Sequence, residues 1–506
     1  MPAAAAGGSA TKERAAQMQA LTPKAYGNLI GGNWAESSSG ETFASVNPAD
    51  TSDVVGHVPR ATREETLLAI EAARKAQPAW AAASPQTRSE VLDSVARLID
   101  DKTAELARML TREEGKTLAE STGEVKRTAA NFRFYAAQAH LVAGQTMVSD
   151  EPSTFLYTLR EPVGVVSVIT PWNFPFAIPA RKIAPALAAG NAVVFKPASL
   201  TPVLGVRLGE LLTEAGLPAG VLNVLTGSAS VVGAELVSND AINAITFTGS
   251  YLVGDSIEHA AATSCRTQLE MGGKNPIIIL GDADMDLAVS CTVRGAFGLT
   301  GQACTGTSRA IVLKSVADQF SEKLIQATKK LTVGHGLEQQ TKIGPVADLQ
   351  QEQTILEYID IGKKEGAELV FGGRKLTGDG FDKGFFIEPA IFAGARSEMR
   401  IAREEIFGPV LAIIQVEDFD EALAVANDSE YGLSAAICTR DLRAAERFAR
   451  SIQSGMVKIN QPTTGVALNA PFGGVKHSST DTFREQGPVA MEFFTRVKTV
   501  SMYYGN

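Results

Sequence analysis

The spacing of apolar and polar positions divides the chain into a helical first part and two later parts in which strands and helices alternate. Before residue 163, apolar residues recur at helical spacing with charged residues between them, a pattern typical of amphipathic helices. After a strand and turn at 29–34, this pattern predicts helices over 62–83, 87–114 and 116–144. Pro85 separates the first two helices. We interpret this part as a scaffold layer.

From Val163 to Ala262, short β-rich apolar runs alternate with helical runs. The predicted strands are 163–170, 192–195, 221–225 and 244–247. The predicted helices are 176–189, 202–215, 230–238 and 251–262. This alternation indicates parallel strands joined by right-handed crossovers. It predicts an α/β fold with a doubly wound sheet, which binds ligands beyond the carboxyl ends of its strands.

A second alternating region begins near Pro276 and predicts a second α/β domain. Its predicted strands are 277–280, 310–313, 410–416, 433–439 and 456–459. Its predicted helices are 285–300, 316–331, 421–427 and 442–451. The last segment, 492–502, alternates as a strand does. An exposed terminal strand often pairs with another sheet or subunit.

Composition and charge restrict the class of protein. A chain of 506 residues is long enough for more than one core. Its net charge of −9 argues against nucleic acid or an anionic membrane as partner. Four cysteines without a C-x-x-C pair favour a reducing compartment over a disulfide framework. With neither a signal-peptide pattern nor an apolar run of transmembrane length, we expect a soluble cytoplasmic protein with a loose tail to about Ala25.

One cysteine stands at a junction where chemistry is plausible. Cys304 lies between Gly301 and Gly306, after a helical run and before a strand-like run. Free cysteine is usually a small buried hydrophobe, so spacing alone leaves its role open. The G-x-G-x-x-G fingerprint and the P-loop are absent. Gly227 and Gly249 follow strands and precede helices, a position that suits either a phosphate site or plain turn chemistry.

Six separated motifs together resemble the aldehyde dehydrogenase superfamily. They are Thr170-Pro-Trp-Asn-Phe-Pro175, Phe195-Lys-Pro-Ala198, Leu269-Glu-Met-Gly-Gly-Lys-Asn-Pro276, Gly301-Gln-Ala-Cys304, Glu404-Glu-Ile-Phe-Gly-Pro409 and Pro471-Phe-Gly-Gly474. The resemblance extends from about Leu29 to about Met502 and is greatest to 2-oxoglutarate-semialdehyde and succinate-semialdehyde dehydrogenases. It implies a Rossmann-like cofactor domain, an α/β catalytic domain and a small β oligomerisation arm. The expected boundaries are a tail at 1–25, a cofactor domain at 26–144 and 161–272, a catalytic domain at 273–478, and an arm at 145–160 and 479–506.

The resemblance assigns four catalytic residues. Oxidation of an aldehyde to an acid needs a nucleophile that forms a thiohemiacetal, and then a base that activates water to hydrolyse the thioester. Cys304 matches the family's nucleophile and Glu270 its base, which burial can tune. Asn173 and the backbone N–H of Cys304 match the oxyanion donors. Lys182 matches the lysine that orders the site. By residue type alone, Glu270 could be a surface acid and Asn173 a turn residue.

The resemblance also implies NADP or NAD as cofactor and assigns the residues that contact it. Among them Lys196 would contact the adenosine ribose and Glu405 the nicotinamide ribose. Ser199 stands where NAD-preferring members place a glutamate, whose negative charge repels a 2′-phosphate. With serine at this position that repulsion is absent. Alternatively, Ser199 caps the helix near Pro202. The full set is Thr170, Pro171, Trp172, Lys196, Ser199, Gly227, Gly233, Phe247, Gly249, Ser250, Gly272, Glu405 and Phe407.

The substrate is expected to be a short semialdehyde with a carboxylate. Arg181, with Phe174 and Phe472, is assigned to the substrate pocket, and it looks like the carboxylate-binding arginine of succinate-semialdehyde dehydrogenases. The position of their second arginine is occupied by Gly298 in this sequence. As an alternative to a role in the substrate pocket, Arg181 is a solvated charge on the protein surface. We expect a homodimer or homotetramer that holds no metal. Two other functions stay open: a coenzyme A-acylating dehydrogenase and a non-catalytic nucleotide-binding protein of the same fold.

Overall fold

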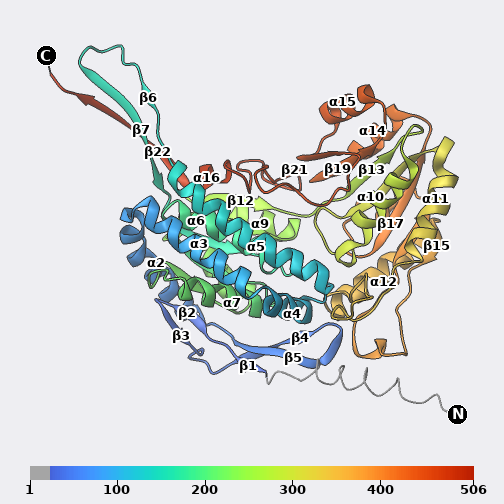
Figure 1. The fold of residues 1–506 in the computed structure, drawn as a ribbon, viewed down its shortest axis with the longest axis horizontal. Helices are drawn as coiled ribbons and strands as arrows, with labels where there is room; N and C mark the ends of the chain where they lie inside the picture. The colour runs from blue at the N-terminus through green and yellow to red at the C-terminus, as the bar shows by residue number, and fades with distance from the viewer. Residues whose placement is uncertain (1–22, 506) are drawn as a thin grey trace.

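The computed structural model of the protein describes residues 23–505, and all but the last residues of the expected N-terminal tail lie outside this range. Lys24 and Ala25, which we expected in the tail, form β1 instead. This strand belongs to a three-stranded sheet with the order β1 (Lys24–Ala25), β5 (Asp50–Pro59) and β4 (Thr42–Asn47). This sheet lies along one edge of the first half of the molecule (Figure 1).

The first α/β unit is built on a seven-stranded sheet. Its order is β12 (Arg266–Glu270), β11 (Ala244–Thr248), β8 (Val165–Ile169), β9 (Ala192–Lys196), β10 (Leu222–Val224), β2 (Asn28–Ile30) and β3 (Asn33–Ala35). The five strands from β12 to β10 are parallel, and β2 and β3 complete the sheet in antiparallel pairing. The predicted doubly wound sheet is confirmed, and its five parallel strands end at the same edge.

Helices cover this sheet: α2 (Arg63–Ala82), α3 (Pro85–Asp101), α4 (Thr103–Glu114), α5 (Leu118–Gln138), α6 (Ala177–Ala188), α7 (Pro202–Glu214), α8 (Ala234–Ser238) and α9 (Tyr251–Ala260). The helices α2 to α5 correspond to the predicted scaffold layer, and α6 to α9 to the predicted alternation with strands. Short turns of helix, η1 (Ala139–Leu141) and η2 (Ala229–Gly233), adjoin α5 and α8. Apolar side chains of the helices and of the sheet form two cores. Trp80, Phe132 and Phe195 are almost fully buried in one of them.

Several predicted helix boundaries are wrong. The helix predicted over 87–114 is two helices, because Lys102 leaves the helical conformation (φ −101°, ψ 14°). The helix predicted over 116–144 ends at Gln138. The helix predicted over 230–238 begins one residue earlier as a π-helical turn. Pro85 does separate two helices, but as the first residue of α3, which Ser84 caps.

A second seven-stranded sheet carries the rest of the predicted alternation. Its order is β15 (Glu368–Gly372), β16 (Ala390–Ala393), β17 (Val410–Val416), β14 (Thr307–Leu313), β13 (Asn275–Ile279), β19 (Ser434–Cys438) and β20 (Met456–Ile459). Only the β15–β16 pair in this sheet is antiparallel. The helices around it are α10 (Met285–Phe297), α11 (Lys314–Thr328), α12 (Leu349–Lys364), α13 (Arg400–Arg403), α14 (Phe419–Asn427) and α15 (Leu442–Ser451), with turns η3 (Gly298–Gly301) and η4 (Phe381–Lys383).

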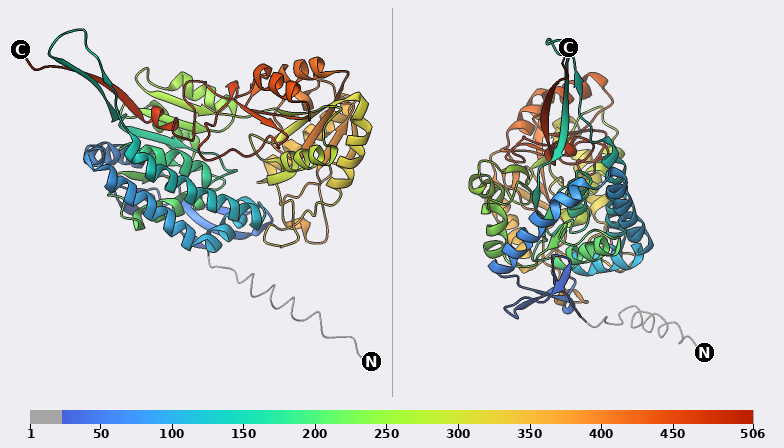
Figure 2. Two further views of the ribbon diagram at one scale, coloured as in Figure 1. Left: turned by 45° about the horizontal axis from the view of Figure 1, so that its top comes forward. Right: turned by 90° about the vertical axis from the view of Figure 1, so that its left-hand side faces the viewer.

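A narrow three-stranded sheet projects from the body beside the first unit (Figures 1 and 2). It pairs β22 (Thr495–Tyr503) with β7 (Thr154–Pro162), and β7 with β6 (Thr146–Met147). The terminal strand predicted over 492–502 is therefore shifted, because α16 (Ala490–Phe493) precedes β22. A two-stranded ladder of β18 (Tyr431–Gly432) and β21 (Val475–Lys476) links the closing segment to the second unit. Within residues 23–505, no helix is long and apolar enough to cross a membrane.

Candidate active site

The site forms where the parallel strands of the first sheet end and the loops of the second unit meet them. β8, β9, β11 and β12 run parallel, so their carboxyl ends present residues at one edge. Three of the six sequence motifs stand at those ends: the motif at 170–175 after β8, the one at 195–198 at the end of β9, and the one at 269–276 at the end of β12. The loop of Cys304 reaches the same place from α10, and Asn173 contacts it directly. The structure therefore brings together segments that are more than 100 residues apart in the chain.

The turn before Cys304 has an unusual backbone. The helix predicted over 285–300 ends at Phe297, because Leu299 and Thr300 adopt left-handed conformations (φ 55° and 56°). Such conformations cost energy in residues other than glycine and are retained where the surroundings impose them. Here the N–H of Leu299 donates to Glu120 Oε1 at 2.7 Å. A Cβ at Gly301 would come 2.2 Å from the carbonyl of Gly408, so this position must be glycine.

Cys304 lies in an apolar wall. Its partly exposed side chain packs, together with Val466, against a buried cluster that we call the thiol cluster: Leu433, Met456 and Phe472. Asn275 Nδ2 donates to the carbonyl of Cys304 at 2.8 Å and holds the loop. Burial raises the pKa of the Cys304 thiol to about 12, and the Glu405 carboxylate adds to the shift. The resting thiol is therefore protonated at neutral pH, and its attack must be coupled to loss of that proton.

Glu270 is a buried carboxylate at the end of β12. It accepts hydrogen bonds from the N–H of Gly474 at 3.3 Å and from the hydroxyl of Ser479 at 3.3 Å. A Cβ at Gly473 would come 2.7 Å from Glu270 Oε1, which explains the paired glycines after Phe472. Burial raises the pKa of Glu270 well above its ordinary value, and the nearby Glu485 raises it further. A surface role is excluded, because only 1% of Glu270 is exposed.

Lys182 and Glu485 form a buried ion pair beside Glu270. The Lys182 ammonium donates to Glu485 Oε1 and, at 2.8 Å, to the hydroxyl of Thr246. Burial lowers the pKa of Lys182, and the Glu485 charge opposes this shift. Backbone hydrogen bonds between Phe472 and Glu485, 2.7 and 2.8 Å long, fix the carboxylate next to the thiol cluster. Lys182 therefore lies in the site, as the resemblance implied.

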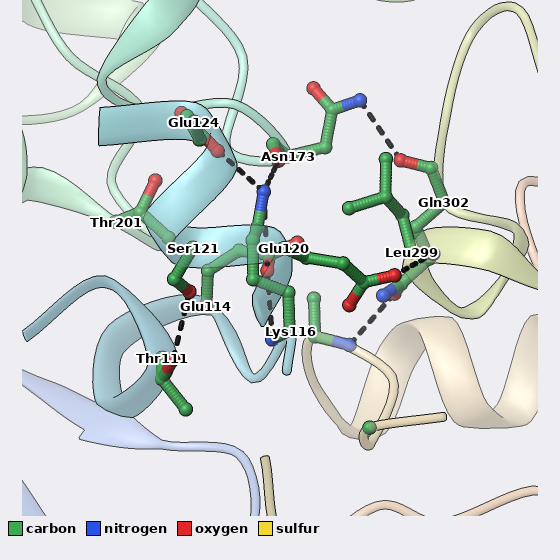
Figure 3. A network of polar contacts seen from close by, with 12 residues as sticks. Thr111, Glu114, Lys116, Glu120, Ser121, Glu124, Asn173, Thr201, Leu299 and Gln302 are labelled. Carbon is green, nitrogen blue, oxygen red and sulfur yellow. Dashed lines mark hydrogen bonds and ion pairs between the residues drawn. The ribbon is translucent and has the colours of Figure 1, made fainter. Parts of the chain in front are cut away.

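Asn173 links the two units. Its Nδ2 donates to the carbonyl of Gln302, two residues before Cys304, at 2.9 Å. The backbone carbonyl of Asn173 accepts a hydrogen bond from Lys116 Nζ at 2.6 Å, and Lys116 Nζ also donates to the Glu124 carboxylate at 2.7 Å (Figure 3). An amide nitrogen has two N–H groups, so one fixes the loop and the second remains available as a donor. The network determines which way the amide faces.

Arg181 lies in the site and is not a solvated surface charge. Its guanidinium stacks over the Phe472 ring, 4.6 Å from the centroid, and pairs with Glu485 Oε2 at 3.6 Å. Its side chain is 13% exposed. Its Nε is buried and has no hydrogen-bond partner in the part of the chain that the structure describes. The Phe174 ring, also expected at the substrate, lies under the Lys116 ammonium, whose Nζ is 4.4 Å from the ring centroid.

The remaining strand ends provide the expected adenosine and phosphate positions. Burial lowers the pKa of Lys196, at the end of β9, to about 8. Ser199 is exposed and donates to the carbonyl of Gly227 at 3.0 Å, so it does not cap α7; that position belongs to Thr201. Ser250 precedes α9 and makes no side-chain cap hydrogen bond, which leaves its hydroxyl free for a phosphate. The other expected residues here are Phe247 and Gly249, at the end of β11, and Gly233, in η2.

Between the two units, Glu405 faces a glycine cradle. Glu405 Oε1 accepts from the N–H of Gly273 at 2.9 Å, and a Cβ at Gly272 would come 2.0 Å from Oε2. Burial raises the pKa of Glu405 to about 7. Phe407 (φ 57°) meets Trp172 edge to face at 5.4 Å. Pro171 adjoins Trp172, and the buried Thr170 hydroxyl has no partner among residues 23–505. These features fit a polar ligand with an aromatic end.

Sequence reasoning missed three residues that the structure places in the site. Glu485 lies in a segment to which no motif was assigned, and Lys116 begins a predicted helix that was interpreted as scaffold. Asn275 stood within a recognised motif but received no role. Only spatial proximity reveals them, since each acts on residues distant in sequence. In the described part of the chain, no group of three or more His, Cys, Asp or Glu side chains could hold a metal ion.

Comparison with known proteins agrees with this geometry. The model of the aldehyde dehydrogenase family matches residues 34–500. An alpha-ketoglutaric semialdehyde dehydrogenase of Bacillus subtilis is 46% identical over 476 residues, which cover 94% of this chain and 97% of that protein. A 2,5-dioxopentanoate dehydrogenase of Saccharolobus solfataricus is 44% identical, with 91% and 96% covered.

Solved structures show the same fold. A betaine aldehyde dehydrogenase of Staphylococcus aureus, solved with NAD+, has a TM-score of 0.92 and 36% identity, with 95% of this chain and 98% of that chain covered. An NADP-dependent enzyme of E. coli has a TM-score of 0.91 and 37% identity, with 94% and 98% covered. The expectation of a Rossmann-like α/β architecture is therefore confirmed.

Proposed function

Because the chain belongs to the aldehyde dehydrogenase family and is an NAD(P)-dependent oxidoreductase acting on aldehydes, we propose that its substrate is a short semialdehyde with a carboxylate, oxidised hydrolytically to the acid. One observation carries this proposal: Arg181 is stacked on Phe472 beside Cys304, where the far end of a short aldehyde would lie. The two relatives named for 2-oxoglutarate-type semialdehydes support the same class.

In the first step, Cys304 is the nucleophile and Asn173 the donor to the oxyanion. Because burial holds the thiol protonated, its proton must pass to a base as the carbon–sulfur bond forms. The free N–H of the Asn173 amide and the backbone N–H of Cys304 can then stabilise the charge on the former aldehyde oxygen. Lys116 contributes indirectly, since it fixes the Asn173 backbone.

In the second step, Glu270 is the base that activates water against the thioester. Its raised pKa makes it a stronger base than an exposed carboxylate, although a smaller fraction of it is ionised at neutral pH. The Lys182–Glu485 pair lies next to it and adjusts its charge state. The presence of Glu270 in this position favours hydrolysis of the thioester over its transfer to coenzyme A.

The cofactor residues fit NAD or NADP. When bound, the nicotinamide cofactor supplies the electron acceptor for the oxidation. Lys196 and Ser199 would hold its adenosine end, Ser250 its phosphates, and Glu405 its nicotinamide ribose. The glycine cradle under Glu405 and the unpartnered Thr170 hydroxyl support this assignment.

Replacing Arg181 tests the substrate class. We expect the wild type to favour 2,5-dioxopentanoate over uncharged pentanal in kcat/KM. Arg181→Ala should lose about 1.5–3 kcal/mol of this preference, mostly through KM, because a charged hydrogen bond is lost. Steady-state kinetics with both aldehydes measure it. A wild type that prefers pentanal would contradict the proposal, and Lys126→Ala, at an exposed lysine of α5, is the control for charge loss alone.

The residue at position 199 predicts which cofactor, NAD or NADP, the enzyme accepts. A serine here places no negative charge near a 2′-phosphate, and Lys196 supplies a positive one close by, so the wild type should accept NADP. Ser199→Glu should lose NADP activity selectively, because like charges at contact repel. The measurement is kcat/KM with each cofactor. Equal loss with NAD and NADP, or a wild type that uses NAD alone, would show that position 199 does not sense the phosphate.

The projecting sheet is the proposed contact between subunits of a homodimer or homotetramer. Its strands expose large apolar side chains, which monomeric proteins seldom leave in a contiguous group: Met147, Phe155, Leu159, Val497, Met502 and Tyr503.

The four cysteines, all of them in the described range, are unpaired, which fits a reducing compartment such as the cytoplasm.

A further inference from the structure

We propose that Arg127, on α5, is the second guanidinium that binds the substrate's anionic end, together with Arg181 on α6. The inference rests on the proposed function, since it requires a substrate with a carboxylate. It identifies a specificity-determining residue where the pattern of succinate-semialdehyde dehydrogenases is broken, because Gly298 stands where their second arginine would be. The charge would come instead from a helix that sequence analysis treated as scaffold.

Arg127 reaches from α5 to the loop beside the catalytic thiol. Its NH2 group donates to the carbonyl of Val466 at 3.1 Å and to Gln486 Oε1 at 2.9 Å. Val466 packs with Cys304 against the thiol cluster. Gln486 follows Glu485, the ion-pair partner of Arg181. Both contacts of Arg127 therefore lie in segments that pack beside Cys304 or carry the ion-pair partner of Arg181.

The two guanidiniums also lie within electrostatic range of each other. Burial lowers the pKa of Arg127, and the positive charge of Arg181 lowers it further. Tyr135, eight residues along α5 and hence on the same helix face as Arg127, lies near both arginines and Glu485. Its hydroxyl donates to the carbonyl of Gly487 at 3.2 Å. This face of α5 thus looks toward Arg181 and the segment after Phe472.

The charges on the pocket wall do not balance. Glu485 is shared between Lys182 and Arg181. The two acceptors of Arg127 are a carbonyl and an amide oxygen, and no acidic side chain of residues 23–505 pairs with its charge. A half-buried cation without a counter-ion is costly, and an anionic substrate removes that cost when it binds. The pocket is therefore locally positive in a chain whose net charge is −9.

Two guanidiniums from two helices suit a 2-oxo acid better than one does. A guanidinium binds a carboxylate through paired N–H groups. The buried Nε of Arg181, without a partner in the described range, is one free donor. With Arg127 alongside, donors are available for a carboxylate and for the carbonyl oxygen next to it. An uncharged aldehyde of equal length would gain nothing from either arginine.

The test compares Arg127→Gln and Arg127→Lys with the wild type, using 2,5-dioxopentanoate and pentanal. Glutamine removes the charge and keeps an N–H donor for the loop, whereas lysine keeps the charge. We expect Arg127→Gln to lose roughly tenfold to a hundredfold in kcat/KM for 2,5-dioxopentanoate, mainly through KM. Activity with pentanal should change less than about threefold, and Arg127→Lys should regain part of the loss.

The matched control is Lys126→Gln, which removes a positive charge from the neighbouring, exposed position of the same helix. It should leave both substrates unaffected. Equal losses with 2,5-dioxopentanoate and pentanal in Arg127→Gln would overturn the proposal, because they would mean that Arg127 only supports the loop. Unchanged kinetics with both substrates would overturn it too.

The outcome for the wild type and Arg181→Ala separates the two proposals. If the wild type prefers the acidic aldehyde and Arg181→Ala loses that preference while Arg127→Gln keeps it, only the role of Arg127 is wrong. If the wild type shows no preference for the acidic aldehyde, the proposed substrate class itself is wrong. In the double variant, a combined loss smaller than the product of the single losses is expected, because both arginines bind one group.

Discussion

Replacing Cys304 by alanine is expected to abolish aldehyde oxidation. The variant cannot form the thiohemiacetal or the thioester, so turnover should fall by several orders of magnitude. The fold should survive, because alanine fills most of the space of a side chain that lies against the thiol cluster without a hydrogen bond of its own. Steady-state assays for activity and titration with NADP for cofactor binding measure both effects.

The other cysteines provide matched controls. Cys265 is half-buried and precedes β12, at the end of that strand opposite Glu270, and Cys291 and Cys438 are buried in the core of the second unit. Cys265→Ala should keep full activity. Cys291→Ala and Cys438→Ala should keep activity too, with a loss of stability limited to the small cavity that they leave. Near-normal turnover in Cys304→Ala would remove the nucleophile from this assignment.

Glu270→Gln is expected to stall hydrolysis of the thioester while the first step still occurs. Removing a general base typically costs roughly 10²–10⁴-fold in rate. Rapid mixing should therefore show a burst of reduced cofactor close to one equivalent per site, followed by a slow steady state. Glutamine is nearly isosteric and can still accept the N–H of Gly474, so the wall around it should hold.

The pH dependence of that step gives a second readout. Burial raises the pKa of Glu270, and the base acts only when it is deprotonated. Steady-state turnover of the wild type should therefore rise with pH through a range above that of an exposed glutamate, and Glu270→Gln should lose this rise. A steady rate that needs added coenzyme A, or a variant with undiminished turnover, would show that another group resolves the thioester.

Local pattern was sufficient for most of the architecture. Strands such as β8 and β9 are short, apolar on both faces and spaced by helices, so their parallel pairing follows from sequence alone. The boundaries that failed lie where one residue leaves the helical conformation, as at Lys102. The helical spacing of apolar residues continues on both sides of Lys102, so the pattern does not report the break. The left-handed turn at Leu299 and Thr300 is a case of the same kind.

The amino-acid sequence by itself determined the chemistry: separated motifs point to a thiol, a base and an oxyanion donor, and these lie in the same site. Tertiary structure decided which charges surround them. Arg181 could have been a solvated residue, and Arg127 gave no signal, since a charged residue on an amphipathic helix has the same pattern whether it faces water or a pocket. Lys116 gave none either, because it lies in the short loop between α4 and α5. The difference lies in desolvation and in the partners that burial imposes, which depend on residues such as Glu485 and Val466, more than 280 positions away from those arginines.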